Sequence, residues 1–199
     1  MADPDYFNKM KNFFKTLVLI VFFLGNLYLL LPPPPELPPL PNSIKSNEPG
    51  DTVQIKGVSA YYTDLSRQEV VDFYTKNFSF SSWLKIPLIT YRLNHPPERI
   101  REVLRPTQFS TYVEEIVHPL RGSLFVNGYE WDNDPFTAPS QRSKNIILVN
   151  GKVYQFKVTL FLQYAPWWQR IAVWWGISFC FYWLFLALEK VAAGFKKLI

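Results

Sequence analysis

The side chains best suited to proton transfer lie together in one short segment of the chain. Glu114, Glu115, His118 and Arg121 place two carboxylates, an imidazole and a guanidinium within eight residues. Such groups suffice for general acid–base catalysis when they share a cleft. Residues 109–117 are predicted to form a strand, however, and adjacent side chains of a strand point to opposite faces. A structural role, with the His-Pro pair shaping a turn, is therefore the competing interpretation.

A second candidate group has the alternating acidic spacing of part of a calcium loop. Glu130, Asp132 and Asp134 lie in the segment GYEWDNDPF and offer carboxylate oxygens to a metal. The glycine and the terminal glutamate of an EF-hand are absent, so a solvated turn is the alternative. No cofactor is predicted, because the chain lacks the common nucleotide, zinc-protease and serine-hydrolase motifs.

Charge and cysteine content exclude two further classes of function. The net charge is +5, but residues 32–166 hold 14 basic and 13 acidic side chains, a balance of only +1. Nucleic-acid binding needs a concentrated basic face, so no nucleic-acid partner is predicted. Cys180 is the only cysteine, which rules out an intrachain disulfide and a zinc site built on several cysteines.

Two apolar runs are predicted to be transmembrane helices, at residues 13–31 and 167–189. The first has no small-residue cleavage site before the prolines that follow, which favours an uncleaved signal anchor over a signal peptide. Asn26 and Cys180 are uncharged, and their presence in the two runs favours helix–helix contacts over a transport path. Aromatic and basic side chains at the ends of such helices belong at the membrane interface. The residues expected there are Lys15, Trp167, Trp168, Arg170 and Lys190.

The basic residues predict the orientation of these two helices. Lys9, Lys11 and Lys15 precede the first run or open it, and three lysines follow the second, whereas the ten residues after the first run contain none. The positive-inside tendency then assigns the tails 1–12 and 190–199 to the cytoplasm. Residues 32–166 are accordingly expected to be extracytoplasmic, in a protein of the cell membrane.

The region between the apolar runs is predicted to hold a linker and a folded domain. Residues 32–51 begin with seven prolines in ten residues, which predicts a polyproline II spacer of about 30 Å. Residues 52–164 show the mixed periodicities of an α+β domain. The predicted fold class is a two-pass α-helical membrane protein with an inserted α+β domain, an antiparallel sheet with two helices on one face.

Several local signals within this domain are specific. Ser66 and Glu69 have the spacing of a capping box at the start of a helix. A second helix is expected between Pro96 and Pro106. Asn150 and Gly151 predict a tight hairpin turn, followed by one long strand, residues 152–164, with a buried and a wet face.

The function predicted from these features is that of a membrane-anchored interaction or assembly module without evident catalysis. Its expected partners are the lipid bilayer and either another protein or a second copy of the chain. The alternative hypothesis is a membrane-tethered enzyme that acts on an envelope or lipid-linked substrate through Glu114, Glu115, His118 and Arg121.

Overall fold

The computed structural model describes residues 4–32, 37–48, 51, 57–81, 85–96 and 110–196. The chain divides into two compact units. One consists of residues 1–31 with 165–199, and the other of residues 32–164. The second helix predicted after Pro96 lies outside the described residues.

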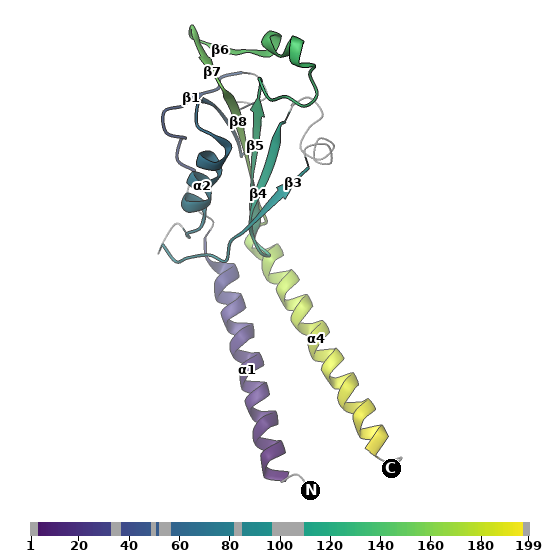
Figure 1. The fold of residues 1–199 in the computed structure, drawn as a ribbon. Coiled ribbons are helices and arrows are strands. Elements are labelled where there is room, and N and C mark those ends of the chain that lie inside the picture. The colour runs from purple at the N-terminus through teal and green to yellow at the C-terminus, as the bar shows by residue number, and fades with distance from the viewer. Residues whose placement is uncertain are drawn as a thin grey trace. The chain divides into compact units, whose positions relative to one another are not determined.

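The first unit contains two long helices, α1 (Pro4–Leu30) and α4 (Trp167–Lys196), shown in Figure 1. Both are long and apolar enough to cross a membrane, over Asn12–Leu30 and Trp167–Val191. Each extends beyond the predicted span, since α1 begins at Pro4 and α4 continues to Lys196.

The two helices of this unit contact each other through a few residues of complementary size and polarity. A Cβ atom added to Gly25 would lie 2.4 Å from the ring of Trp174, so only glycine lets this ring approach α1 closely. Nε1 of Trp175 donates a hydrogen bond to Oδ1 of Asn26 (2.9 Å). The predicted role of Asn26 in a helix–helix contact is therefore confirmed, whereas Cys180 is exposed.

The second unit is built on a six-stranded antiparallel sheet with the strand order β1-β2-β8-β5-β4-β3. The central strands β5 and β8 pair over nine residues, from Gly122 opposite Tyr164 to Glu130 opposite Phe156. The strands are β1 (Ile44–Lys45), β2 (Val58–Thr63), β3 (Tyr91–His95), β4 (Tyr112–His118), β5 (Gly122–Glu130) and β8 (Phe156–Tyr164).

Helix α2 (Arg67–Phe78) covers one face of this sheet (Figure 1). The predicted capping box is confirmed, because the Ser66 side chain accepts a hydrogen bond from the backbone N–H of Glu69 while the Glu69 carboxylate accepts one from Ser66 N. The apolar side of the helix packs against inward residues of the sheet. This core contains Val70, Val71, Tyr74, Phe78, Tyr61, Tyr112, Ile116, Leu124, Val126, Val158 and Leu160.

Gly128 and Tyr112 form a cross-strand pair at the end of the β4–β5 ladder where β4 begins. A Cβ atom at position 128 would lie 2.0 Å from the Tyr112 ring. The aromatic ring thus fills the space that the glycine leaves in a central strand.

The proline-rich segment differs from the free spacer that the sequence predicts. Leu40 belongs to the buried core and Leu37 packs against it, while β1 pairs with β2. Ser46 and Asp51 are also buried, and Lys157 of β8 pairs with Asp51 at 2.9 Å. Apolar leucines between the prolines give this segment a reason to fold onto the domain, so at least residues 37–48 and 51 are part of it.

The predicted turn at Asn150 and Gly151 is confirmed, since both residues have positive φ, 52° and 78°. The prediction of a single long strand after this turn is wrong. The chain forms a short strand β7 (Lys152–Tyr154), which pairs only with β6 (Ile147–Val149) in a separate two-stranded sheet, and β8 starts after Gln155. A short 3₁₀ helix, η1 (Pro139–Asn145), precedes β6. Strand β5 continues to Glu130.

Candidate functional site

Strand β4 and the turn after it carry the four side chains proposed for acid–base chemistry, but the fold separates them. Glu114 and His118 share the face covered by α2. They are four residues apart on the strand, which separates their backbone positions by roughly 13 Å. Glu115 points to the opposite face, where it pairs with His95. Arg121 lies in the turn between β4 and β5. The four groups therefore do not converge on one reacting atom.

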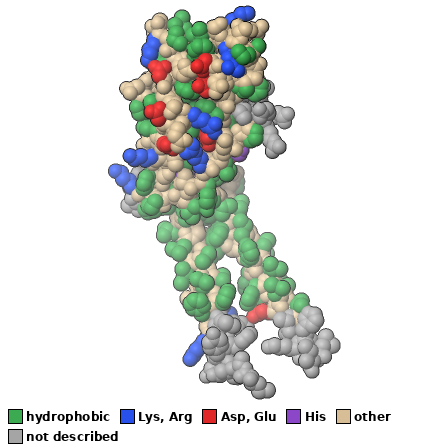
Figure 2. Space-filling view, in the orientation of Figure 1, with side chains coloured by type: hydrophobic (Ala, Val, Ile, Leu, Met, Phe, Trp, Pro, Cys, Tyr) green, Lys and Arg blue, Asp and Glu red, His purple; other side chains and the backbone are tan. Residues whose placement is uncertain are grey.

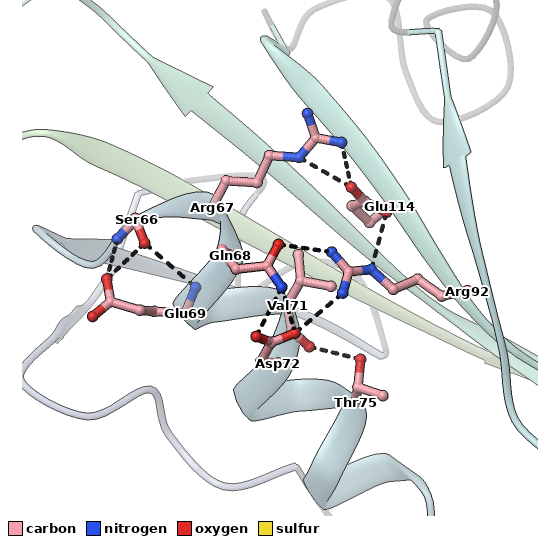
Figure 3. Close-up of polar contacts among 9 residues, drawn as sticks. All are labelled: Ser66, Arg67, Gln68, Glu69, Val71, Asp72, Thr75, Arg92 and Glu114. Carbon is pink, nitrogen blue, oxygen red and sulfur yellow. Dashed lines mark hydrogen bonds and ion pairs between the residues drawn. The ribbon is translucent and has the colours of Figure 1, made fainter.

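Glu114 lies at the centre of what we name the Glu114 cluster, formed with Arg67, Arg92 and Asp72 (Figure 3). Its side chain is only 4% exposed. Arg67 donates from Nε (3.0 Å) and from Nη2 to Oε1, and Nε of Arg92 lies 3.5 Å from Oε2. Both carboxylate oxygens are thus occupied as acceptors for guanidinium groups. This arrangement suits a structural ion pair, which joins α2 and β3 to β4.

Local structure explains how the two arginines reach this carboxylate. Ser66 ends the loop and caps α2, which places Arg67 at the first helical position, above the ring of Tyr112 (5.0 Å to its centroid). Arg92 stands on the edge strand β3, where its guanidinium also bridges to Asp72 of α2 at 3.1 Å. The cluster is therefore a product of the helix start, the edge strand and β4 together.

His118 is the centre of a second group, the His118 cluster, formed with Phe78, Tyr164 and Arg121. The imidazole is buried and stacks on the Phe78 ring at 4.2 Å with an interplanar angle of 8°. Nδ1 of His118 shares a hydrogen bond with the Tyr164 hydroxyl. Burial and the positive charge of Arg121 lower the pKa of His118 to about 4, against a smaller opposing contribution from the backbone at Phe78. At neutral pH the ring is uncharged.

Arg121 connects the His118 cluster to the two chain segments that lead to and from the apolar helices. Its guanidinium lies over the Tyr164 ring (5.8 Å to the centroid), and Nη2 donates to the carbonyl of Pro32 at 2.9 Å. Tyr164 ends β8, and Pro32 follows α1 in the sequence after one residue. The buried arginine thus holds the beginning and the end of the domain side by side.

Glu115 and His95 form a pair on the other sheet face, with His95 Nε2 and Glu115 Oε2 2.7 Å apart. The two side chains are 15% and 29% exposed, so water reaches both. The pair joins the edge strand β3 to β4. Within the described residues, this is the only contact between a histidine and a carboxylate that involves one of the four candidate side chains.

The acidic segment after β5 forms a folded turn. Asp134 is buried, and its carboxylate accepts hydrogen bonds from the backbone N–H of Phe136 (2.9 Å) and the hydroxyl of Thr137 (2.6 Å). Glu130 accepts from Asn133 at 3.3 Å. In the part of the chain that the structure describes, no three His, Cys, Asp or Glu side chains are grouped to hold a metal ion. Glu130, Asp132 and Asp134 are therefore not brought together as ligands.

The residues predicted for the membrane interface divide into two kinds. Trp167 and Trp168 are 61% and 56% exposed, and Lys15 and Lys190 are also exposed. Arg170 is buried instead, at 5% exposure.

Comparison with known proteins adds no family. The chain matches no protein-family model, no curated protein and no solved structure. Its function must therefore be argued from the geometry above. That geometry shows carboxylates and an imidazole that support the fold, and it shows no convergent set among the predicted catalytic residues.

Sequence reasoning missed the partners that give Glu114 and His118 their roles. Arg67 and Arg92 lie 47 and 22 residues away from Glu114, and Tyr164 lies 46 residues from His118. One signal was available: Glu114 and His118 have the same strand parity as the apolar Tyr112 and Ile116, which indicates an inward direction. Parity alone does not identify a partner.

Proposed function

We propose that this chain is a two-pass membrane protein whose α1 and α4 cross the bilayer and hold residues 32–166 on its extracytoplasmic side. The observation that carries the proposal is the exposure of both helices. Only 6% of the apolar window of α1 and none of that of α4 is buried. A core helix of a water-soluble domain would be mostly buried, whereas lipid tails can cover such a surface.

The orientation in this proposal rests on the basic residues. Lysines gather before the first helix and after the second, and the domain between the helices is close to neutral. Interhelical contacts at Gly25, Asn26 and Trp174 support a closely packed pair, as small and polar residues do inside membranes.

We further propose that the domain acts as an interaction or assembly module rather than as an enzyme. Support comes from the way the candidate residues are used: Glu114 is held by two arginines, Asp134 by turn hydrogen bonds, and His118 by stacking and burial. Such groups contribute to a rigid scaffold. A domain whose polar groups are committed to its own structure is suited to presenting a surface.

Cysteine labelling in intact cells tests the membrane topology. Cys180 is replaced by serine, and single cysteines are introduced at exposed positions Asn42 and Lys190. A membrane-impermeant maleimide should label position 42 in intact cells and position 190 only after lysis. Labelling of position 190 but not 42 in intact cells would reverse the orientation, and release of the chain by alkaline carbonate would contradict membrane spanning.

In-cell crosslinking followed by mass spectrometry tests the interaction role. The expected result is a reproducible crosslink from residues 37–164 to a second copy or to another envelope protein. Recovery of the monomer alone, both from crosslinked cells and from mild detergent, would contradict the proposal.

A further inference from the structure

The β6–β7 hairpin and the 3₁₀ helix before it present an apolar surface that the core does not use. We call residues 136–154 the hairpin segment. Leu148 and Val153 are directly paired across the hairpin and therefore point to the same face, and they are 64% and 48% exposed. Ile146 and Phe136 nearby are 40% and 39% exposed. None of the four belongs to the hydrophobic core cluster.

The charge of the hairpin segment has one sign. It contains Arg142, Lys144 and Lys152 and no acidic residue. Lys152 pairs with Asp64 at 2.8 Å, and Arg142 donates to the backbone carbonyls of Asp132 and Thr137 rather than to a carboxylate. Hydrophobic and basic side chains lie at the top of the view in Figure 2, where Figure 1 labels β6 and β7, and acidic side chains lie close below them. An anionic surface would complement this segment.

The hairpin segment lies at the opposite end of the sheet from the two chain connections. Arg121 holds Pro32 and Tyr164 together at one end of β8. Phe156, at the other end, is eight residues from Tyr164, about 26 Å along the strand. The hairpin segment continues beyond Phe156, so the domain's own strands separate it from the segments that lead to α1 and α4.

We propose that the hairpin segment binds the anionic surface of a second lipid bilayer, distinct from the one proposed to hold α1 and α4. This inference rests on the membrane anchoring proposed above. Exposed aliphatic and aromatic side chains enter the headgroup boundary, while Lys144 and Arg142 meet anionic headgroups. A lipid surface fits better than a protein partner, because the exposed anchors are Leu, Val, Ile and Phe, whereas protein hot spots are dominated by Trp, Tyr and Arg.

A vesicle flotation assay with the full chain tests this proposal. The chain is placed in nanodiscs of phosphatidylcholine, and vesicles of phosphatidylcholine mixed with phosphatidylserine are added. We expect the loaded nanodiscs to float with these vesicles. The double variant L148S/V153S should weaken the association at least about tenfold, since it removes most of the exposed apolar area of the hairpin face. K144Q should weaken it about fivefold at low salt.

The matched control is I89S, which changes an apolar side chain that is 55% exposed outside the hairpin segment and should leave flotation unchanged. Because Leu148 and Val153 are exposed, their replacement leaves the core intact, which circular dichroism verifies. Absence of flotation, equal flotation with pure phosphatidylcholine vesicles, or an equal loss in I89S would overturn the proposal. So would pairing of nanodiscs with one another that L148S/V153S abolishes, because the segment would then bind a second copy.

Anchoring has its own readout in the same experiment. Co-elution of the chain with nanodiscs in gel filtration reports membrane insertion before any vesicle is added. A chain that elutes apart from the nanodiscs contradicts the anchoring, and a chain that enters them but does not float contradicts only the role of the hairpin segment.

Discussion

The Glu114 cluster and the His118 cluster lie on the same strand and the same sheet face, yet the domain buries their central groups in opposite ways. Glu114 is matched by two guanidinium groups, whereas His118 is buried as a neutral ring between aromatic side chains. Pairing suits a carboxylate whose ordinary pKa lies far below neutrality, and neutralisation suits an imidazole whose ordinary pKa lies close to it. The two strategies make different demands on pH and on neighbouring residues.

The largest effect should come from leaving Glu114 without its partners. The double variant R67A/R92A keeps the buried carboxylate and removes both guanidinium groups, which should lower the free energy of unfolding by about 3–5 kcal/mol. Urea denaturation of the full chain in detergent, followed by circular dichroism, measures the change. The control R92A/D72A leaves Arg67 on the carboxylate and should lose clearly less. A loss below about 1 kcal/mol in R67A/R92A would show that the pairing is not what stabilises this buried group.

A smaller effect should come from protonating His118. Its pKa in the folded domain is about 4, below the ordinary value of 6.5, so the unfolded chain binds a proton first as the pH falls. The stability contributed by the neutral ring is nearly full above pH 6.5 and is lost progressively towards pH 4, by about 2.5 kcal/mol at pH 4.5. Urea denaturation at pH 7.0, 6.0, 5.0 and 4.5, all in the range where this ring titrates, gives the profile.

The variant H118F separates this contribution from the titration of carboxylates. A phenyl ring can stack on Phe78 but binds no proton, so the profile between pH 6.5 and 5 should become flatter. R121M should also flatten it, because the positive charge that disfavours imidazolium is removed. An unchanged slope in both variants would mean that His118 does not control this part of the pH dependence.

The smallest effect is expected at the partly exposed pair on the opposite face. E115Q removes the carboxylate beside His95 and should change the free energy of unfolding by less than about 1 kcal/mol, because water screens the pair. The change should shrink further in high salt. A loss as large as that of R67A/R92A would contradict the contrast between the two sheet faces.

The features that could be predicted from the sequence are those written in short segments. Ser66 and Glu69 predict the start of a helix, and Asn150 and Gly151 predict a turn. The uninterrupted apolar runs predict the two long helices. Each signal depends on residues within a few positions of one another. The antiparallel sheet likewise follows from local alternation and tight turns.

The contacts that define the candidate sites depend instead on which strands become neighbours. Arg92 reaches Glu114 only because β3 pairs with β4 in one register, and Tyr164 reaches His118 only because β8 ends beside β4's partner β5. The sequence predicts a spacer around Leu40 because prolines dominate its surroundings, although the Leu40 side chain joins the core. The proline content of that segment therefore did not reveal which of its side chains pack against the domain.

The contact between Arg121 and Pro32 has a mechanical consequence. Because one arginine touches both the first residue of the domain and the ring that ends its central strand, a force that separated these two points would act on this contact. We expect the force then to act on the end of β8. It would separate the paired residues of neighbouring strands one after another, rather than shear whole strands at once. Arg121 is therefore expected to be among the first contacts that such a force breaks.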